Sequence, residues 1–116
     1  MKLLFIYNAN TGFLNSALDS AHKFISPKTY NCNLCSLTHG NFKENKLWKS
    51  FRESVNIDLE FYHKNEFEQS YNYKTNYPIV LKVEGNQLFT VLSSNDLNQI
   101  TSTKSLILKL ETLIKP

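Results

Sequence analysis

The chain has 116 residues, of which 41% are hydrophobic and 13% aromatic, which is enough for one domain with a buried core and argues against disorder. Its 13 basic and 10 acidic residues give a formal net charge of +3, and no basic arm indicates a nucleic-acid partner. No apolar run approaches the ~20 residues of a membrane span, and no signal-peptide pattern is present. We therefore expect a single cytoplasmic domain over residues 1–116 with no membrane or nucleic-acid partner.

The chain is predicted to begin with a central strand. Lys2–Tyr7 is a nearly unbroken apolar run, which is typical of a strand covered on both faces. It stops at Asn8-Ala9-Asn10-Thr11-Gly12, where short polar residues and a glycine favour a turn. Apolar residues then recur at helical spacing over residues 14–25, which predicts a helix. His22 falls on the border of the apolar stripe of this helix, one turn from Asp19.

Both cysteines lie in the segment that follows. Residues 28–40 are mostly polar and carry Cys32 and Cys35, so we interpret them as a loop between two helices. Long loops in small domains are uncommon and often functional. Asn41 and Glu44 have the spacing of a capping box, which predicts that the next helix begins there. The apolar face of that helix would consist of Leu47, Trp48, Phe51 and Val55.

The second half of the chain predicts an edge strand, a short helix, a hairpin and a last helix. Residues 56–62 alternate between apolar and polar side chains, which suits a half-exposed or edge strand, and residues 65–71 suit a short helix. After Tyr77-Pro78, two apolar runs at 79–83 and 88–92 flank a glycine turn, which predicts a hairpin. Ser102 or Thr103 can cap the final amphipathic helix.

This order of elements resembles the thioredoxin-like fold, an α/β fold with a mixed four-stranded sheet and helices on both faces. The resemblance implies that Pro78, with Tyr77 before it, is a cis proline facing the active site. Two alignments onto the fold are open. In one, Thr29–Asn31 is the central strand and Cys32–Cys35 begins a helix; in the other, Lys2–Tyr7 is the central strand and the cysteines lie in a loop inserted after the first helix. We prefer the second alignment because Thr29–Asn31 is short and polar.

Three short motifs also resemble a family of small, uncharacterised bacterial proteins. They are Tyr7-Asn8-Ala9-x-x-Gly12, Asp19-x-x-His22-Lys23 and Cys32-x-x-Cys35. The resemblance implies that the first turn, the border of the first helix and the cysteine segment converge, but it implies no reaction. The predicted binding or supporting residues are therefore Asn8, Asn10, Thr11, Asp19, His22, Tyr77 and Pro78.

The Cys-x-x-Cys spacing allows two sulfurs to form a disulfide or to share a metal ion. In a reducing compartment such a pair favours thiol–disulfide exchange or thiol sensing, with Cys32 and Cys35 as the catalytic residues. The partner would be a protein thiol or a small thiol, and no cofactor is needed. The alternatives are a zinc or copper site formed by Cys32, Cys35, His39 and His22, a protein-interaction module without catalysis, or two structural cysteines.

The remaining patterns favour ordinary roles. A basic stripe on the helix after the cysteines is diluted by Glu44 and Glu53, so we interpret it as a solvated helix face. Three glycines and the absence of a Gly-x-x-x-x-Gly-Lys loop argue against a nucleotide partner. His63 lies at a predicted strand end and is expected to be solvated. The basic stripe consists of Lys43, Lys46, Lys49 and Arg52.

Overall fold

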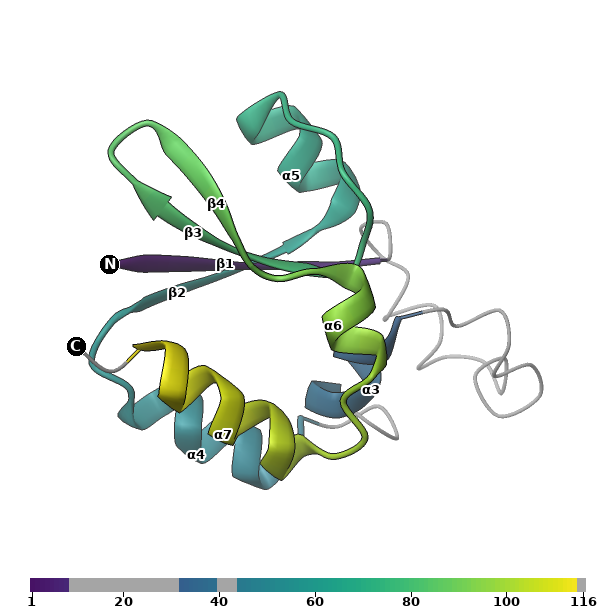
Figure 1. Cartoon of the computed structure of the whole chain (residues 1–116), viewed down its shortest axis with the longest axis vertical. Coiled ribbons are helices and arrows are strands. Elements are labelled where there is room, and N and C mark those ends of the chain that lie inside the picture. Colours follow the sequence, from purple (N-terminus) through teal and green to yellow (C-terminus); the bar gives the residue numbers. More distant parts are fainter. Residues whose placement is uncertain (9–31, 40–43, 115–116) are drawn as a thin grey trace.

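The structure, a computed structural model, describes residues 1–8, 32–39 and 44–114. In these parts of the chain four strands form one sheet with the order β2-β1-β3-β4 (Figure 1). The central strand β1 pairs in parallel with β2 and antiparallel with β3, and β3 pairs antiparallel with β4. The predicted α/β class with a mixed four-stranded sheet is confirmed. The strands are β1 (Lys2–Tyr7), β2 (Asp58–His63), β3 (Ile79–Glu84) and β4 (Gln87–Leu92).

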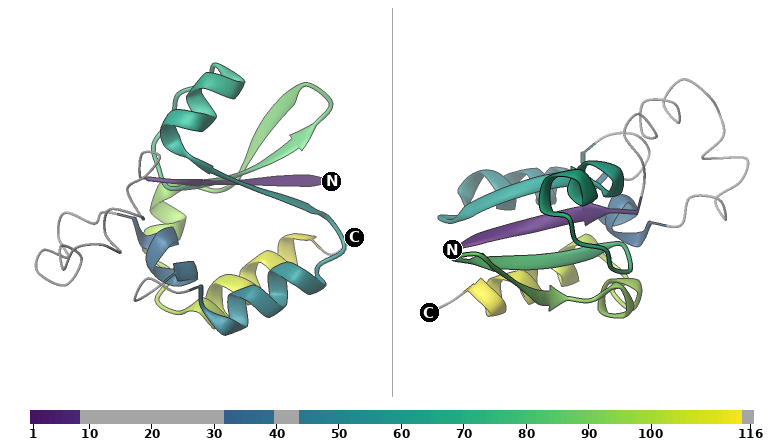
Figure 2. Two further views of the ribbon diagram at one scale, coloured as in Figure 1. Left: turned by 180° about the vertical axis from the view of Figure 1, so that it is seen from behind. Right: turned by 90° about the horizontal axis from the view of Figure 1, so that it is seen from above.

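Helices cover both faces of the sheet, as predicted. In Figure 1, α5 lies above the sheet, whereas α3, α4, α6 and α7 lie below it, and the left view of Figure 2 shows the same layers from behind. None of the described helices is long and apolar enough to cross a membrane. The helices are α3 (Asn33–His39), α4 (Lys46–Ser54), α5 (Lys64–Tyr71), α6 (Ser94–Asn98) and α7 (Thr103–Ile114).

The central strand supplies the core on both faces. Leu3, Phe5 and Tyr7 belong to the large core cluster beneath the sheet, where Phe5 packs against Trp48 with ring centroids 5.4 Å apart. Leu4 and Ile6 belong to the smaller cluster with Phe67 of α5. The alternation of β1 side chains between two apolar layers explains its unbroken apolar sequence. The prediction that Lys2–Tyr7 is the central strand is confirmed.

The segment that carries the cysteines has a different structure from the one predicted. Residues 33–39 form the helix α3, whereas the preferred alignment predicted a loop inserted after the first helix. Leu34, Cys35, Leu37 and Thr38 are buried, so the helix has an apolar face once the cysteine is counted as a small hydrophobe. The buried Thr38 hydroxyl donates to the carbonyl of Leu34 at 2.9 Å, which allows a polar residue on that face.

Two further helix boundaries differ from the predictions. The helix α4 begins at Lys46 and not directly after the predicted cap Asn41, because the Asn45 side chain caps it by accepting the Trp48 backbone N–H at 3.2 Å. The short helix α6 was not predicted; Ser93 and Asp96 form a capping box at its start. Residue Asn41 and the predicted helix over 14–25 lie outside the described residues.

The packing around Phe5 predicts a large loss of stability on truncation. Phe5 is 0% exposed and contacts the rings of Trp48 and Phe61. We expect Phe5→Ala to lower the free energy of unfolding by about 3–5 kcal/mol, because it removes apolar burial and leaves a cavity. Urea unfolding followed by circular dichroism measures this change. Leu47→Ala is the control on the exposed face of α4, where Leu47 is 57% exposed, and a loss as large as that of Phe5→Ala would contradict the packing argument.

Candidate functional site around the cysteine pair

One end of the sheet collects the residues that the sequence analysis singled out. The last residues of the parallel strands β1 and β2, Tyr7 and His63, are register partners. On the other side of β1, Ile6 pairs with Ile79, the first residue of β3, so the buried Pro78 lies at the same end of the sheet. The Tyr77–Pro78 peptide bond is cis, as the resemblance implied. The carboxyl ends of parallel strands are the usual position of a site in α/β sheets.

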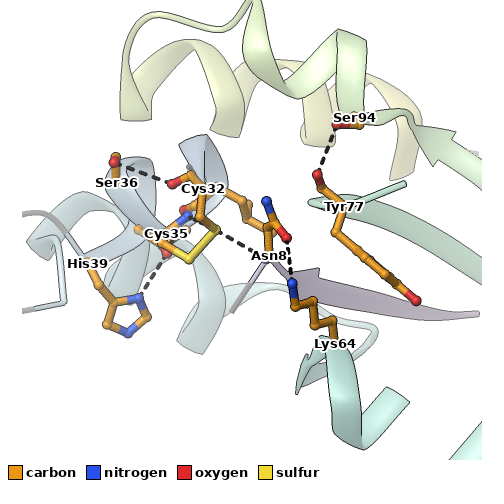
Figure 3. Close-up of a disulfide and its surroundings, with 10 residues drawn as sticks. Asn8, Cys32, Cys35, Ser36, His39, Lys64, Tyr77 and Ser94 are labelled. Atoms are coloured by element: carbon orange, nitrogen blue, oxygen red, sulfur yellow. Dashed lines mark hydrogen bonds between the residues drawn. A yellow bond between two sulfur atoms is a disulfide. The ribbon is translucent and has the colours of Figure 1, made fainter. Parts of the chain in front are cut away.

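The cysteine pair lies at this end of the sheet, at the start of α3 (Figure 3). Cys32 and Cys35 form a disulfide with their Cα atoms 5.2 Å apart, and the carbonyl of Cys32 accepts the N–H of Ser36 as the first bond of the helix. Cys32 therefore occupies the N-cap position. The first alignment correctly placed the cysteines at a helix start, and the second correctly identified the central strand.

Two backbone N–H groups point at the sulfur of Cys32. Its Sγ accepts the N–H of Asn8 at 3.3 Å and the N–H of Cys35 at 3.2 Å. The second of these bonds is a side-chain N-cap with sulfur as the acceptor. In the reduced protein the same donors would favour the thiolate of Cys32 over its thiol, because hydrogen bonds to a charged form stabilise that form.

The start of α3 is attached to a distant part of the chain. The side-chain amide of Asn33 donates to the carbonyls of Leu97 and Ile100, the latter at 3.0 Å. Near the other end of the helix, the Thr103 hydroxyl donates to the carbonyl of Leu37 at 2.6 Å. The helix that carries the disulfide is therefore held by the segment from α6 to the start of α7. Sequence analysis missed Asn33 because its partners are backbone carbonyls 64 and 67 residues away.

The residues before β3 are also fixed. The carbonyl of Tyr77 accepts the hydroxyl of Ser94 at 3.1 Å (Figure 3), and the Tyr77 hydroxyl donates to the carboxylate of Glu68 at 2.7 Å. Burial and this carboxylate raise the pKa of Tyr77 above its ordinary value, so the phenol stays protonated at neutral pH. On the other side, the Lys64 ammonium donates to the Asn8 side chain at 3.3 Å. Asn8 is thus bound through both its backbone and its side chain.

The structure places only some of the predicted site residues. Asn8 contacts Cys32, and Tyr77 and Pro78 lie at the same sheet end, as described above. Asn10, Thr11, Asp19 and His22 lie outside the described residues.

The zinc or copper alternative gains no support from the described geometry. His39 ends α3, one helical turn beyond Cys35, and its Nδ1 lies 2.8 Å from the hydroxyl of Thr38. The two sulfurs are bonded to each other. Within residues 1–8, 32–39 and 44–114, no three His, Cys, Asp or Glu residues are grouped to hold a metal ion. A site that includes His22 stays a prediction for the reduced protein.

The chain matches no protein-family model, no curated protein and no solved structure. Its class is therefore defined by its own geometry. It is an α/β protein with a mixed four-stranded sheet and a Cys-x-x-Cys disulfide that caps a short helix beside the end of the central strand.

The attachment of α3 through Asn33 predicts a specific loss. Asn33→Ala removes two hydrogen bonds and takes the Asn33 donor from the Ile100 carbonyl, whereas the Leu97 carbonyl still accepts the Ile100 N–H, so we expect the free energy of unfolding to fall by about 1–3 kcal/mol. We also expect faster hydrogen exchange of the Ser36 amide, because the first turn of α3 loses its anchor. Both effects are measurable by urea unfolding and NMR.

The control is Asn98→Ala, which changes an exposed asparagine at the end of α6. It should leave the exchange rate of Ser36 unchanged. Equal exchange rates in Asn33→Ala and the unmodified protein would show that the Asn33 side chain does not hold the helix.

Proposed function

We propose that this protein carries out thiol–disulfide exchange on a thioredoxin-like scaffold, with Cys32 as the attacking sulfur and Cys35 as the resolving sulfur. The observation that carries the proposal is the environment of Cys32. Its sulfur accepts two backbone N–H groups and belongs to the slightly more exposed cysteine, because Cys32 is 2% and Cys35 0% exposed. A stabilised thiolate next to a buried second thiol is the arrangement that exchange chemistry requires.

The scaffold part of the proposal is supported by the element order and by the strand order of the sheet. It is also supported by the position of Cys32 beside Asn8, directly after the central strand. Residues 9–31 separate that strand from the cysteine pair in the sequence. The cysteine pair nevertheless lies at the end of the strand. The disulfide and the helix start are therefore next to the central strand in space, although they are far from it in the sequence.

The proposed reaction has two balanced steps. The thiolate of Cys32 attacks one sulfur of a partner disulfide, which forms a mixed disulfide and releases the first partner thiolate. The Cys35 sulfur, after losing its proton, then attacks the Cys32 sulfur, which closes the Cys32–Cys35 disulfide and releases the second partner thiolate. Two electrons pass from the protein to the partner disulfide, and no cofactor takes part. The reverse steps return the protein to its reduced form at the expense of two partner thiols.

Burial of the disulfide restricts the partner. Cys32 is 2% exposed, and a thiolate must approach its sulfur along the S–S axis for the reverse reaction. A small thiol or a narrow extended protein segment meets fewer obstacles there than a folded surface. We therefore infer that the partner is a small thiol or a cysteine in an extended protein segment, in the cytoplasm.

Thiol titration tests the assignment of the two sulfurs. In Cys35→Ser, we expect the Cys32 thiol to titrate below the ordinary value of about 8.5, because the N–H groups of Asn8 and Cys35 are backbone groups and remain. Absorbance of the thiolate against pH and the rate of alkylation measure this shift. Cys32→Ser is the matched variant, in which the remaining Cys35 thiol lacks those donors and should react more slowly.

Equilibration with reduced and oxidised glutathione completes the test. We expect reversible interconversion of the dithiol and the disulfide, and a mixed disulfide that accumulates only in Cys35→Ser. Ordinary titration of both thiols together with a disulfide that does not exchange would instead indicate a structural bridge.

A further inference from the structure

A pocket of about 310 Å³ lies at the carboxyl end of the two parallel strands. Tyr7 and His63, the last residues of β1 and β2, line it together with His39, the last residue of α3. Neither cysteine is among the described residues that line it. The pocket is therefore a feature separate from the disulfide, although both are located at the same end of the sheet.

The walls of the pocket are mainly aromatic. Tyr7 contacts the imidazole rings of His39 and His63, with centroids 6.0 and 6.2 Å away, and Trp48 and Phe61 also line the pocket. Small-ligand pockets begin at roughly 300 Å³ and are lined by apolar and aromatic groups with a few polar ones. The volume and the walls suit a molecule with one flat ring.

The imidazoles are fixed by hydrogen bonds. Nδ1 of His63 lies 3.0 Å from the Glu66 carboxylate, which is within the distance for a hydrogen bond from the imidazole to the carboxylate. The Thr38 hydroxyl has one proton, which it donates to the Leu34 carbonyl. In the hydrogen bond between this hydroxyl and His39, Nδ1 of the imidazole is therefore the donor. Both rings are thus held as walls, and their positions do not depend on a ligand. His63 was expected to be solvated, and its side chain is 25% exposed.

Arg52 has N–H donors beyond those that it uses in its ion pair with Glu44. Both oxygens of Glu44 accept from Arg52, at 2.7 Å from Nε and 2.8 Å from one terminal nitrogen. The pair uses only two of the five N–H donors of the guanidinium. The hydrogen bond from Arg52 lowers the pKa of Glu44, so the carboxylate is ionised at neutral pH. Arg52 was predicted to lie on a solvated face; instead it lines the pocket.

Trp48 contributes to the pocket as part of its aromatic wall. Its side chain is 0% exposed, and among the described residues its Nε1 is the buried side-chain atom without a hydrogen-bond partner. A buried N–H without an acceptor costs about 1–3 kcal/mol. The donors that remain are those of Arg52, and they favour a ligand that brings acceptor oxygens.

We propose that this pocket binds a small aromatic carboxylate. The ring lies against the aromatic walls formed by Tyr7, Trp48 and Phe61, and the carboxylate accepts hydrogen bonds from Arg52. The proposal does not depend on the redox chemistry of the cysteines.

Benzoate is the test probe, and the only tryptophan of the chain is the reporter. In the full chain labelled with ¹⁵N, the indole N–H of Trp48 gives one resonance, which is followed by NMR as benzoate is added. We expect a saturable shift. Benzyl alcohol has a similar size but no charge, and we expect it to bind about tenfold more weakly because it lacks the charge-assisted hydrogen bonds.

Two substitutions should change the affinity in opposite directions. Arg52→Met should weaken benzoate binding about tenfold, because it removes the donors. Glu44→Gln should strengthen binding by about threefold, because it removes the competing carboxylate and frees the guanidinium. Both variants break the same ion pair, so a merely structural role would change the affinity in the same direction. Lys46→Met removes a positive charge from an exposed position on the same helix and should leave the affinity unchanged.

Three results would overturn the proposal. They are the absence of a saturable shift with benzoate, equal affinity for benzyl alcohol, and weaker binding in both Arg52→Met and Glu44→Gln. If Arg52→Met does not fold, the sign of the change in Glu44→Gln decides the matter alone, with folding of each variant checked by circular dichroism.

Discussion

Burial of β1 on both faces determines where everything else lies. Leu3 to Tyr7 are all buried, with alternate side chains in two separate apolar layers. Such a strand has to be flanked by strands on both sides and by helices above and below, because water can reach neither its edges nor its faces. Since β1 ends at Tyr7, the backbone of Asn8 emerges at the sheet end shared by His63 and Pro78. The bond from Asn8 to Cys32 connects the disulfide to this position.

The disulfide depends in turn on contacts that lie far away in the sequence. The helix α3 has seven residues, and isolated helices shorter than about 12–15 residues are only marginally stable in water. Its geometry is therefore maintained by tertiary contacts, including those of Asn33 and Thr103 with other elements. Because the spacing of the two sulfurs follows from the first turn of this helix, the segment from α6 to α7 contributes to the stability of the disulfide without touching either sulfur.

Hydrophobic patterns predicted the sheet well and the site less well. The continuous run of β1, the alternation of β2 and the hairpin of β3 and β4 follow from burial periodicity, which is a local property. The preferred alignment missed the helix α3 because residues 28–40 are mostly polar in sequence, although Cys35 and Thr38 are buried. Arg52 was assigned to a solvated stripe because helical periodicity says nothing of Glu44, which precedes the helix and folds back to it. The contacts of Asn33 involve distant backbone carbonyls, and residue types carry no information about those.

The disulfide and the aromatic pocket share α3 but occupy different ends of it. Cys32 caps the helix and His39 ends it. A ligand changes a redox equilibrium only if it binds the oxidised and reduced forms with different affinities. Reduction breaks the bond between the sulfurs, whereas the hydrogen bonds of Asn33 and Thr103 do not involve sulfur. Because these bonds do not depend on the bond between the sulfurs, we expect the wall formed by His39 to stay in place on reduction and the affinity of the pocket to be independent of the redox state of the cysteines.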